Sequence, residues 1–244
     1  MAGHSKWANI KHKKAAQDAK RGKMFTKIIK ELMVSARDGG SDQESNPRLR
    51  QAIVTAKAAN MPNDTLKRAI QKGAGELEGV DYEEFIYEGY GPGGIAIIME
   101  VMTDNKNRTV AEIRHLMNKC GGSLGDSGSV SWMFEKVGQV IISNKGLDEN
   151  IVLDDVLNMG AIDFLSRNSE FIISTEPSDL ARISDEMDEK NYKIISSKIE
   201  MLPKSWVKIS GEELNKVLVL MDHLEEQDDI QNLYANFEFD ENFE

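Results

Sequence analysis

The chain changes both its charge and its hydrophobic pattern near Gly75, and this change constrains the fold more than any other feature. Residues 1–75 contain sixteen Lys or Arg against six Asp or Glu, whereas residues 76–244 contain fourteen against thirty-five. The net charge of the whole chain is −11. Apolar residues recur at helical spacing before Gly75 and at strand spacing after it. The sequence therefore predicts a basic helical part followed by acidic parts that combine sheets and helices.

Composition excludes several other classes of protein. A length of 244 residues with 40% hydrophobic and 29% charged residues is typical of a globular protein of two or three domains. No apolar run approaches the roughly 18 residues of a membrane-spanning helix. Cys120 is the single cysteine, so no internal disulfide or multi-cysteine metal site can form. Because the N-terminus matches neither a signal peptide nor a transit peptide, we expect a cytoplasmic protein that does not bind membranes.

Residues 1–75 predict a basic arm and a small helical domain. Residues 1–23 contain too few apolar side chains to fold alone, so we expect a mobile arm there. Three amphipathic helices are predicted within residues 24–75. Gly39 and Gly40 end the first, Pro47 opens the second and Asn63 caps the third.

Residues 76–244 predict two α/β domains, one inserted in the other. Residues 137–209 follow the order βαββαβ of a ferredoxin-like unit, and residues 76–136 with 210–244 form the discontinuous domain around it. In that outer domain we expect a hairpin at 91–94, a helix opened by a capping box at 109–112, a strand at 130–134 and a last strand at 233–239. The predicted fold class is α+β and multidomain, with an N-terminal three-helix domain and two α/β ferredoxin-like domains.

The basic arm and the outer faces of the predicted helices form a candidate nucleic-acid-binding surface. Clustered cations displace counterions from phosphate backbones, and an exposed Trp can stack on an unpaired base. A solvated tail that only keeps the chain soluble is the alternative explanation. The pattern does not distinguish DNA from RNA. The candidate contact residues are Lys6, Trp7, Lys11, His12, Lys13, Lys14, Lys20, Arg21, Lys23, Arg50, Lys57, Lys67 and Arg68.

Candidate catalytic constellations are scarce. The four histidines are dispersed, and the glycines at 91–94 lack the Lys-Ser/Thr of a phosphate-binding loop and precede a strand. The glycine-rich segment 121–129 is interpreted as a flexible surface loop, and acidic runs such as 225–229 as solvated surface. We therefore expect no enzyme activity, no cofactor, no bound metal and no small-molecule substrate.

Several sequence motifs of the chain resemble those of one known family. They run from the opening signature to the C-terminal region and are Ala2–Lys14, Arg21–Lys23, Asn60–Asp64, Tyr87–Gly94, Thr103–Asn105, Asn107–Thr109, Gly128–Val130 and Asp228–Asn232. In these motifs the chain resembles the YebC/PmpR family, which also includes the mitochondrial translational activator of cytochrome oxidase. The likeness extends over nearly the whole chain.

The resemblance implies a cytoplasmic, non-enzymatic protein with one helical and two α/β domains. Members are described as DNA-binding transcriptional regulators, and others as ribosome-associated translation factors that help synthesis through difficult sequences such as proline runs. Both hypotheses stay open at this point, with DNA as the partner in the first and ribosomal RNA or tRNA on the ribosome in the second. Because the chain begins directly at the opening signature, we expect a bacterial-type member without a presequence.

Overall fold

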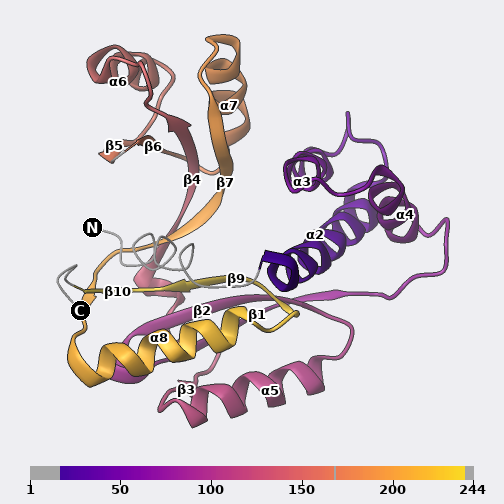
Figure 1. Ribbon diagram of the computed structural model, residues 1–244, viewed down its shortest axis with the longest axis vertical. Coiled ribbons are helices and arrows are strands. Elements are labelled where there is room, and N and C mark those ends of the chain that lie inside the picture. Colours follow the sequence, from indigo (N-terminus) through magenta and orange to yellow (C-terminus); the bar gives the residue numbers. More distant parts are fainter. Residues whose placement is uncertain (1–16, 168, 240–244) are drawn as a thin grey trace. The chain divides into compact units, whose positions relative to one another are not determined.

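The helical domain consists of three helices that enclose one apolar core. The computed structural model describes residues 17–167 and 169–239, with side chains from residue 21 onward. The helices are α2 (Gln17–Gly39), α3 (Pro47–Ala58) and α4 (Asn63–Gly73). In Figure 1, α2 is the long helix, and α3 and α4 pack against it. Their core is made of Ile28, Leu32, Met33, Ala36, Leu49, Ala52, Ile53, Ala56, Met61, Leu66 and Ala69.

Two local features hold these helices together. Asn46 is buried, its Oδ1 caps α3 by accepting from Leu49 N at 3.0 Å, and its Nδ2 donates to Ser35 O at 2.8 Å near the end of α2. A Cβ on Gly73 would lie 2.2 Å from Met33 O, so only glycine lets α4 end this close to α2. The N-cap predicted at Asn63 is wrong, because α4 begins at that residue and Pro62, which has no such side chain, occupies the cap position.

The helix α2 also begins earlier than its apolar pattern indicates. We expected helix from residue 24, whereas α2 begins at Gln17 and includes the last part of the predicted arm. Helix formers such as Ala19, Lys20 and Arg21 occupy these positions, so the backbone continues as a helix without an apolar face.

The next domain is a four-stranded antiparallel sheet whose one face is covered by two helices. The strand order is β3-β1-β2-β9, and the last strand comes from the C-terminal part of the chain. Figure 1 shows α5 and α8 beneath this sheet, where their apolar faces share one core with β2 and β9. The elements are β1 (Glu83–Tyr90), β2 (Ala96–Thr103), α5 (Lys106–Lys119), β3 (Ser123–Leu124), α8 (Gly211–Glu225) and β9 (Ile230–Ala235).

The predicted hairpin between β1 and β2 is confirmed, and its turn is the short 3-10 helix η1 (Pro92–Gly94). The capping box predicted at Thr109 is wrong, because Asn105 caps α5 by accepting from Arg108 N. The predicted last strand is divided into β9 and β10 (Phe237–Glu238), and β10 pairs in parallel with the short strand β8 (Val207–Lys208).

The strand predicted at 130–134 is also wrong, and Glu88 explains why. Residues Ser131–Met133 form a second 3-10 turn, η2. The buried Glu88 carboxylate accepts from the backbone N–H groups of Gly128, Val130 and Ser131, each at 2.7 Å. Burial alone would raise the pKa of Glu88, but these three N–H groups lower it below its ordinary value. The segment after β3 is therefore held by a carboxylate from β1.

Residues Met133–Lys204 form the second compact unit of the chain, and residues up to Trp132 with those from Ser205 form the first. In the second unit the strand order β5-β6-β4-β7 with all pairs antiparallel is that of the predicted βαββαβ arrangement. Its core lies between this sheet and two helices. The elements are β4 (Phe134–Ser143), α6 (Glu149–Asn158), β5 (Asp163–Arg167), β6 (Glu170–Thr175), α7 (Leu180–Glu189) and β7 (Ile194–Pro203).

The predicted fold class is confirmed: the chain is α+β, with an N-terminal three-helix domain and two α/β domains, one of which is inserted in the other. The limits predicted for the arm and the three domains stay a prediction. Among the described residues, no helix has the length and apolar character needed to cross a membrane.

Candidate nucleic-acid interface

The predicted contact residues fall into three groups in the structure. Those of the arm lie outside the described residues: Lys6, Trp7, Lys11, His12, Lys13 and Lys14. Lys20 belongs to α2, but its side chain is not described. The others have described side chains on the three helices of the helical domain: Arg21, Lys23, Arg50, Lys57, Lys67 and Arg68.

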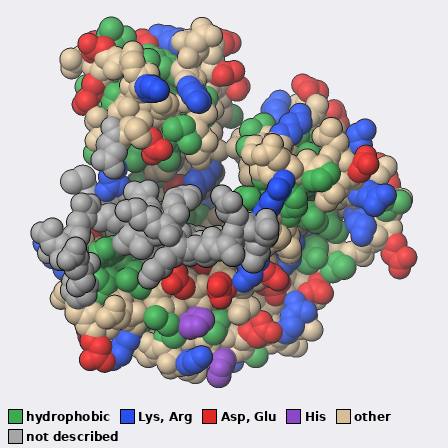
Figure 2. Space-filling view, viewed as in Figure 1, with side chains coloured by type: hydrophobic (Ala, Val, Ile, Leu, Met, Phe, Trp, Pro, Cys, Tyr) green, Lys and Arg blue, Asp and Glu red, His purple; other side chains and the backbone are tan. Residues whose placement is uncertain are grey.

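Four of these cations are exposed on α3 and α4, and no acid among the described residues engages them. Arg50 and Lys57 are seven residues apart on one face of α3, and Lys67 and Arg68 are adjacent on α4. Within residues 17–167 and 169–239, none of the four forms a side-chain hydrogen bond or ion pair. Figure 2 shows Lys and Arg side chains interspersed with apolar ones on the visible face of the helical domain. Their charge is available for a polyanion.

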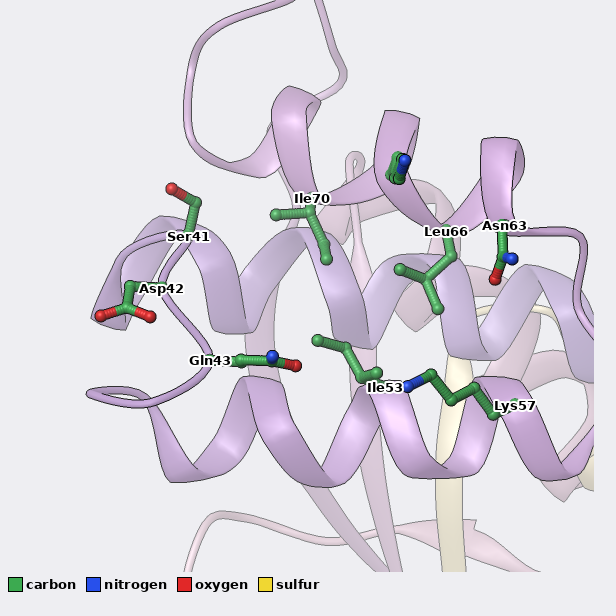
Figure 3. Close-up of a pocket in the computed structure, with 9 residues that line it drawn as sticks. Ser41, Asp42, Gln43, Ile53, Lys57, Asn63, Leu66 and Ile70 are labelled. Atoms are coloured by element: carbon green, nitrogen blue, oxygen red, sulfur yellow. The ribbon is translucent and has the colours of Figure 1, made fainter.

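A groove between α3 and α4 brings two of these cations together. It has a volume of about 480 Å³ and is open to solvent, with Lys57 on one wall and Lys67 on the other. Figure 3 shows the Lys57 amine and the Gln43 amide reaching into the groove. The complete lining is Ser41, Asp42, Gln43, Ile53, Lys57, Asn63, Leu66, Lys67 and Ile70.

Arg21 and Lys23 make different contacts, although both are at the start of α2. The Arg21 guanidinium lies 5.3 Å from the centre of the Phe25 ring and donates to Asn60 O at 3.4 Å. Lys23 Nζ donates to Glu226 O at 3.1 Å, at the C-terminal end of α8. Lys23 is therefore already placed against the negative end of a helix dipole.

Lys23 is the first of three lysines that face α8 and the segment after it. Lys27 and Lys30 follow at helical spacing; Lys27 Nζ donates to Glu225 O at 3.4 Å. Lys30 is 4% exposed, and its amine donates to Met102 O at 3.2 Å, Asp228 O at 2.9 Å and Asp229 Oδ1 at 2.6 Å. These three acceptors satisfy all three N–H donors of the ammonium group. We call Lys23, Lys27 and Lys30 the inner lysine row.

Asp229 is the acidic centre of this contact. Its second oxygen accepts from Thr109 Oγ1 at 2.5 Å and from Arg108 Nη2 at 3.2 Å. Burial alone would raise the pKa of Asp229, but the hydrogen bonds from Lys30, Thr109 and Arg108 lower it to about 2. The prediction that the acidic run 225–229 is solvated surface is therefore wrong for Asp229, which is 8% exposed.

Two arginines of the helical domain are also engaged by acids. Arg48 donates to Glu31 Oε1 at 2.7 Å and to Glu84 Oε1 at 2.7 Å, and the hydrogen bonds to these carboxylates raise its pKa. Arg37 donates to Asp38 and Asp81 and to the backbone carbonyl of Tyr82. Arg48 and Arg37 are therefore ion-pair residues, in contrast to the four exposed cations of α3 and α4.

Sequence reasoning missed the inner lysine row and the groove. The spacing of Lys23, Lys27 and Lys30 indicates a continuous lysine face on a helix. Asp229 lies in one of the motifs that carry the family resemblance. Nothing in the sequence indicates that Gln43 lies beside α3 and α4. Among residues 17–167 and 169–239, no group of His, Cys, Asp and Glu has the arrangement of a metal site.

The fold and the surface define a class: a multidomain α+β protein with a cationic three-helix domain ahead of two sheet domains. Within this class the chain belongs to the TACO1/YebC family, which confirms the resemblance seen in the sequence. The model of the TACO1/YebC N-terminal domain matches residues 5–76, and that of the TACO1/YebC second and third domain matches residues 82–237.

Similar proteins extend over the full chain. A "Probable transcriptional regulatory protein" of Carboxydothermus hydrogenoformans is 52% identical over 98% of this chain and 99% of its own length. A protein of the same description from Clostridium acetobutylicum is 49% identical over 100% of both chains. The crystal structure of a conserved hypothetical protein from Aquifex aeolicus has a TM-score of 0.87 and 47% identity, and covers 96% of this chain and 97% of its own.

Proposed function

We propose that the chain is a non-enzymatic, nucleic-acid-binding regulatory protein of the cytoplasm, and that duplex DNA is its target in the regulation of transcription. One observation carries this proposal: Arg50, Lys57, Lys67 and Arg68 are exposed on two neighbouring helices, with no acid bound to them in the described part of the chain. The basic arm precedes the same domain in the sequence. Relatives described as probable transcriptional regulatory proteins also support a role in the regulation of transcription.

The geometry suits contacts to the phosphate backbone better than reading of bases. Lysine and arginine side chains on the outside of two short helices fix a protein on a duplex, whereas sequence choice needs side chains that reach base edges. The remaining domains are strongly acidic and repel a polyanion. Binding is therefore concentrated on the helical domain and the arm.

The test is the salt dependence of duplex binding, measured by fluorescence anisotropy. Each phosphate contact that is lost reduces the slope of log K against log salt by about 0.9. Replacement of Arg50, Lys57, Lys67 and Arg68 by Gln is expected to reduce the slope by about 2 to 4. The matched control changes four exposed lysines of the acidic domains to Gln, which alters the net charge equally: Lys119, Lys145, Lys193 and Lys208. Equal slopes for the two variants contradict the proposal.

A ribosome-associated translation factor is the second candidate. It is favoured by Trp7, the only aromatic residue of the basic arm, because RNA loops offer unpaired bases for stacking. Binding to ribosomes that survives an excess of mixed-sequence duplex supports this candidate. Binding to a promoter that exceeds binding to random duplex by roughly 10³ or more supports transcriptional regulation instead.

A further inference from the structure

We infer that the groove between α3 and α4 binds one unpaired base of a single-stranded nucleic acid, while Lys57 and Lys67 hold the phosphates on either side of it. This inference rests on the proposed nucleic-acid binding of the helical domain and adds to it a site for unpaired bases, which an intact duplex does not offer. It concerns the groove alone and does not involve the basic arm.

The shape of the groove favours a base over a duplex. A duplex presents its phosphates outward and keeps its bases stacked inside, so a base reaches a recessed apolar surface only when it is unpaired. The groove has a volume of about 480 Å³, within the usual range of small-ligand sites. The apolar part of the lining is the half-buried Ile70 with the small exposed edges of Ile53 and Leu66, each 7% exposed, and we infer that the face of a base lies against them.

The polar groups around this apolar surface fit the edge of a base. Ser41, Gln43 and Asn63 offer hydroxyl and amide groups, which both donate and accept hydrogen bonds. Recognition of unpaired bases in RNA uses such contacts on their exposed edges.

Charge selects a nucleic acid over an apolar peptide. Lys57 and Lys67 come from opposite walls and have no acidic partner in the described ranges. Asp42 is the acidic residue of the lining, but its two oxygens already accept from Glu44 N at 3.0 Å and Ser45 Oγ at 3.2 Å. An apolar peptide would leave both lysines without a counter-charge, whereas a phosphate on each side neutralises them.

The experiment fills the groove without changing its charge. Gln43→Trp places a large ring where the Gln43 amide reaches into the groove, and Gln71→Trp places the same ring on an exposed position of α4 that is not in the lining. Both full-length variants are titrated against short RNA and DNA single strands of one sequence, and against the corresponding DNA duplex. Circular dichroism checks that each variant is folded.

We expect Gln43→Trp to weaken single-strand binding by about five- to tenfold, with duplex binding changed less than twofold and Gln71→Trp close to wild type. A strand of abasic nucleotides should bind wild type and Gln43→Trp equally, because it has no base to place. A loss restricted to the RNA strand assigns the site to RNA, and equal losses on both strands assign it to unpaired bases in general.

Two results overturn the inference: unchanged single-strand binding by Gln43→Trp, or equal losses on single strand and duplex. Failure of the proposed function is a separate result: the wild-type protein then does not bind the duplex, whereas the groove is tested by the single strands alone. Wild-type duplex binding with a normal salt slope but no effect of Gln43→Trp rejects the groove and retains the function.

Discussion

The inner lysine row of α2 and the cations of α3 and α4 belong to one domain but have opposite environments. Lys30 is buried with a full set of acceptors, and Lys23 contacts the C-terminal end of α8. Lys57 and Lys67 are exposed without an acidic partner in the described part of the chain. The cations of the domain are therefore of two kinds: those that contact the C-terminal part of the chain, and those that the proposed function assigns to a nucleic acid. Four variants and conditions test this division.

The largest effect is expected from Asp229→Asn, which leaves the buried Lys30 ammonium without its carboxylate. Removal of one partner of a buried ion pair costs about 3–5 kcal/mol. Urea unfolding measures the loss of stability, and hydrogen exchange of the α2 and α8 backbone amides shows where it occurs. The control is the double variant Asp229→Asn/Lys30→Met, which also removes the unpaired buried ammonium and should recover part of the lost stability. A loss below about 1 kcal/mol contradicts this role of Asp229.

Acid should weaken the same contact, by a smaller amount. The folded-state pKa of Asp229 is about 2, below its usual value of 3.8. Its contribution to stability is therefore fully present above about pH 4 and is lost as the pH falls towards 2; a shift of this size corresponds to about 2 kcal/mol. The difference in stability between wild type and Asp229→Asn should shrink over that range. A constant difference from pH 6 to pH 2 would show that Asp229 is not the group that titrates.

Charge reversal on the outer surface should affect binding and leave stability unchanged. Lys57→Glu would remove one of the proposed phosphate contacts and add repulsion, so we expect duplex affinity at 0.1 M salt to fall roughly five- to tenfold. The free energy of unfolding should change by less than about 0.5 kcal/mol, as is usual for exposed sites. Lys119→Glu on α5 serves as the control of equal charge. Equal losses of affinity in both variants would indicate a general charge effect.

The smallest effect is expected from Lys23→Gln, and it should be on stability. The amine of Lys23 contacts the carbonyl end of α8, where a cation contributes about 0.3–1 kcal/mol. Thermal unfolding at low and high salt measures this loss, which should shrink at high salt through screening. The salt slope of duplex binding should be unchanged. A reduced slope would place Lys23 on the nucleic-acid surface, as the sequence predicted.

The sequence was sufficient for features that depend on nearby residues. The helical period of α2 and α3, the proline at the start of α3 and the glycine turn between β1 and β2 are local signals, and each was confirmed. The helical spacing of the cations also predicts that Arg50, Lys57, Lys67 and Arg68 are exposed, as they are in the structure. Their contact with a nucleic acid stays a prediction.

The failures came from partners that are distant along the chain. The segment at 130–134 has the alternation of a strand, but its backbone N–H groups bind Glu88, which lies on β1. Lys23 has the charge expected of a nucleic-acid contact, yet its amine donates to the carbonyl of Glu226, the C-cap residue of α8, 203 residues away. The start of α5 failed in the same way: Asn105 and Thr109 both fit an N-cap, but Thr109 donates to Asp229, 120 residues away, and Asn105 is the cap.

The insertion of a whole domain between β3 and α8 also has a consequence for synthesis of the chain. β2 must pair with β9, and Glu100 lies 132 residues before its partner Asn232. At a translation rate of about 5–20 residues per second, β9 is synthesised roughly 7 to 26 seconds after β2, and the edge of β2 is unpaired during that time. Lys30 lacks the Asp229 carboxylate for even longer. The nascent protein thus carries an open sheet edge and an unmatched lysine row until its last residues emerge, which makes the inserted domain the first α/β part able to fold.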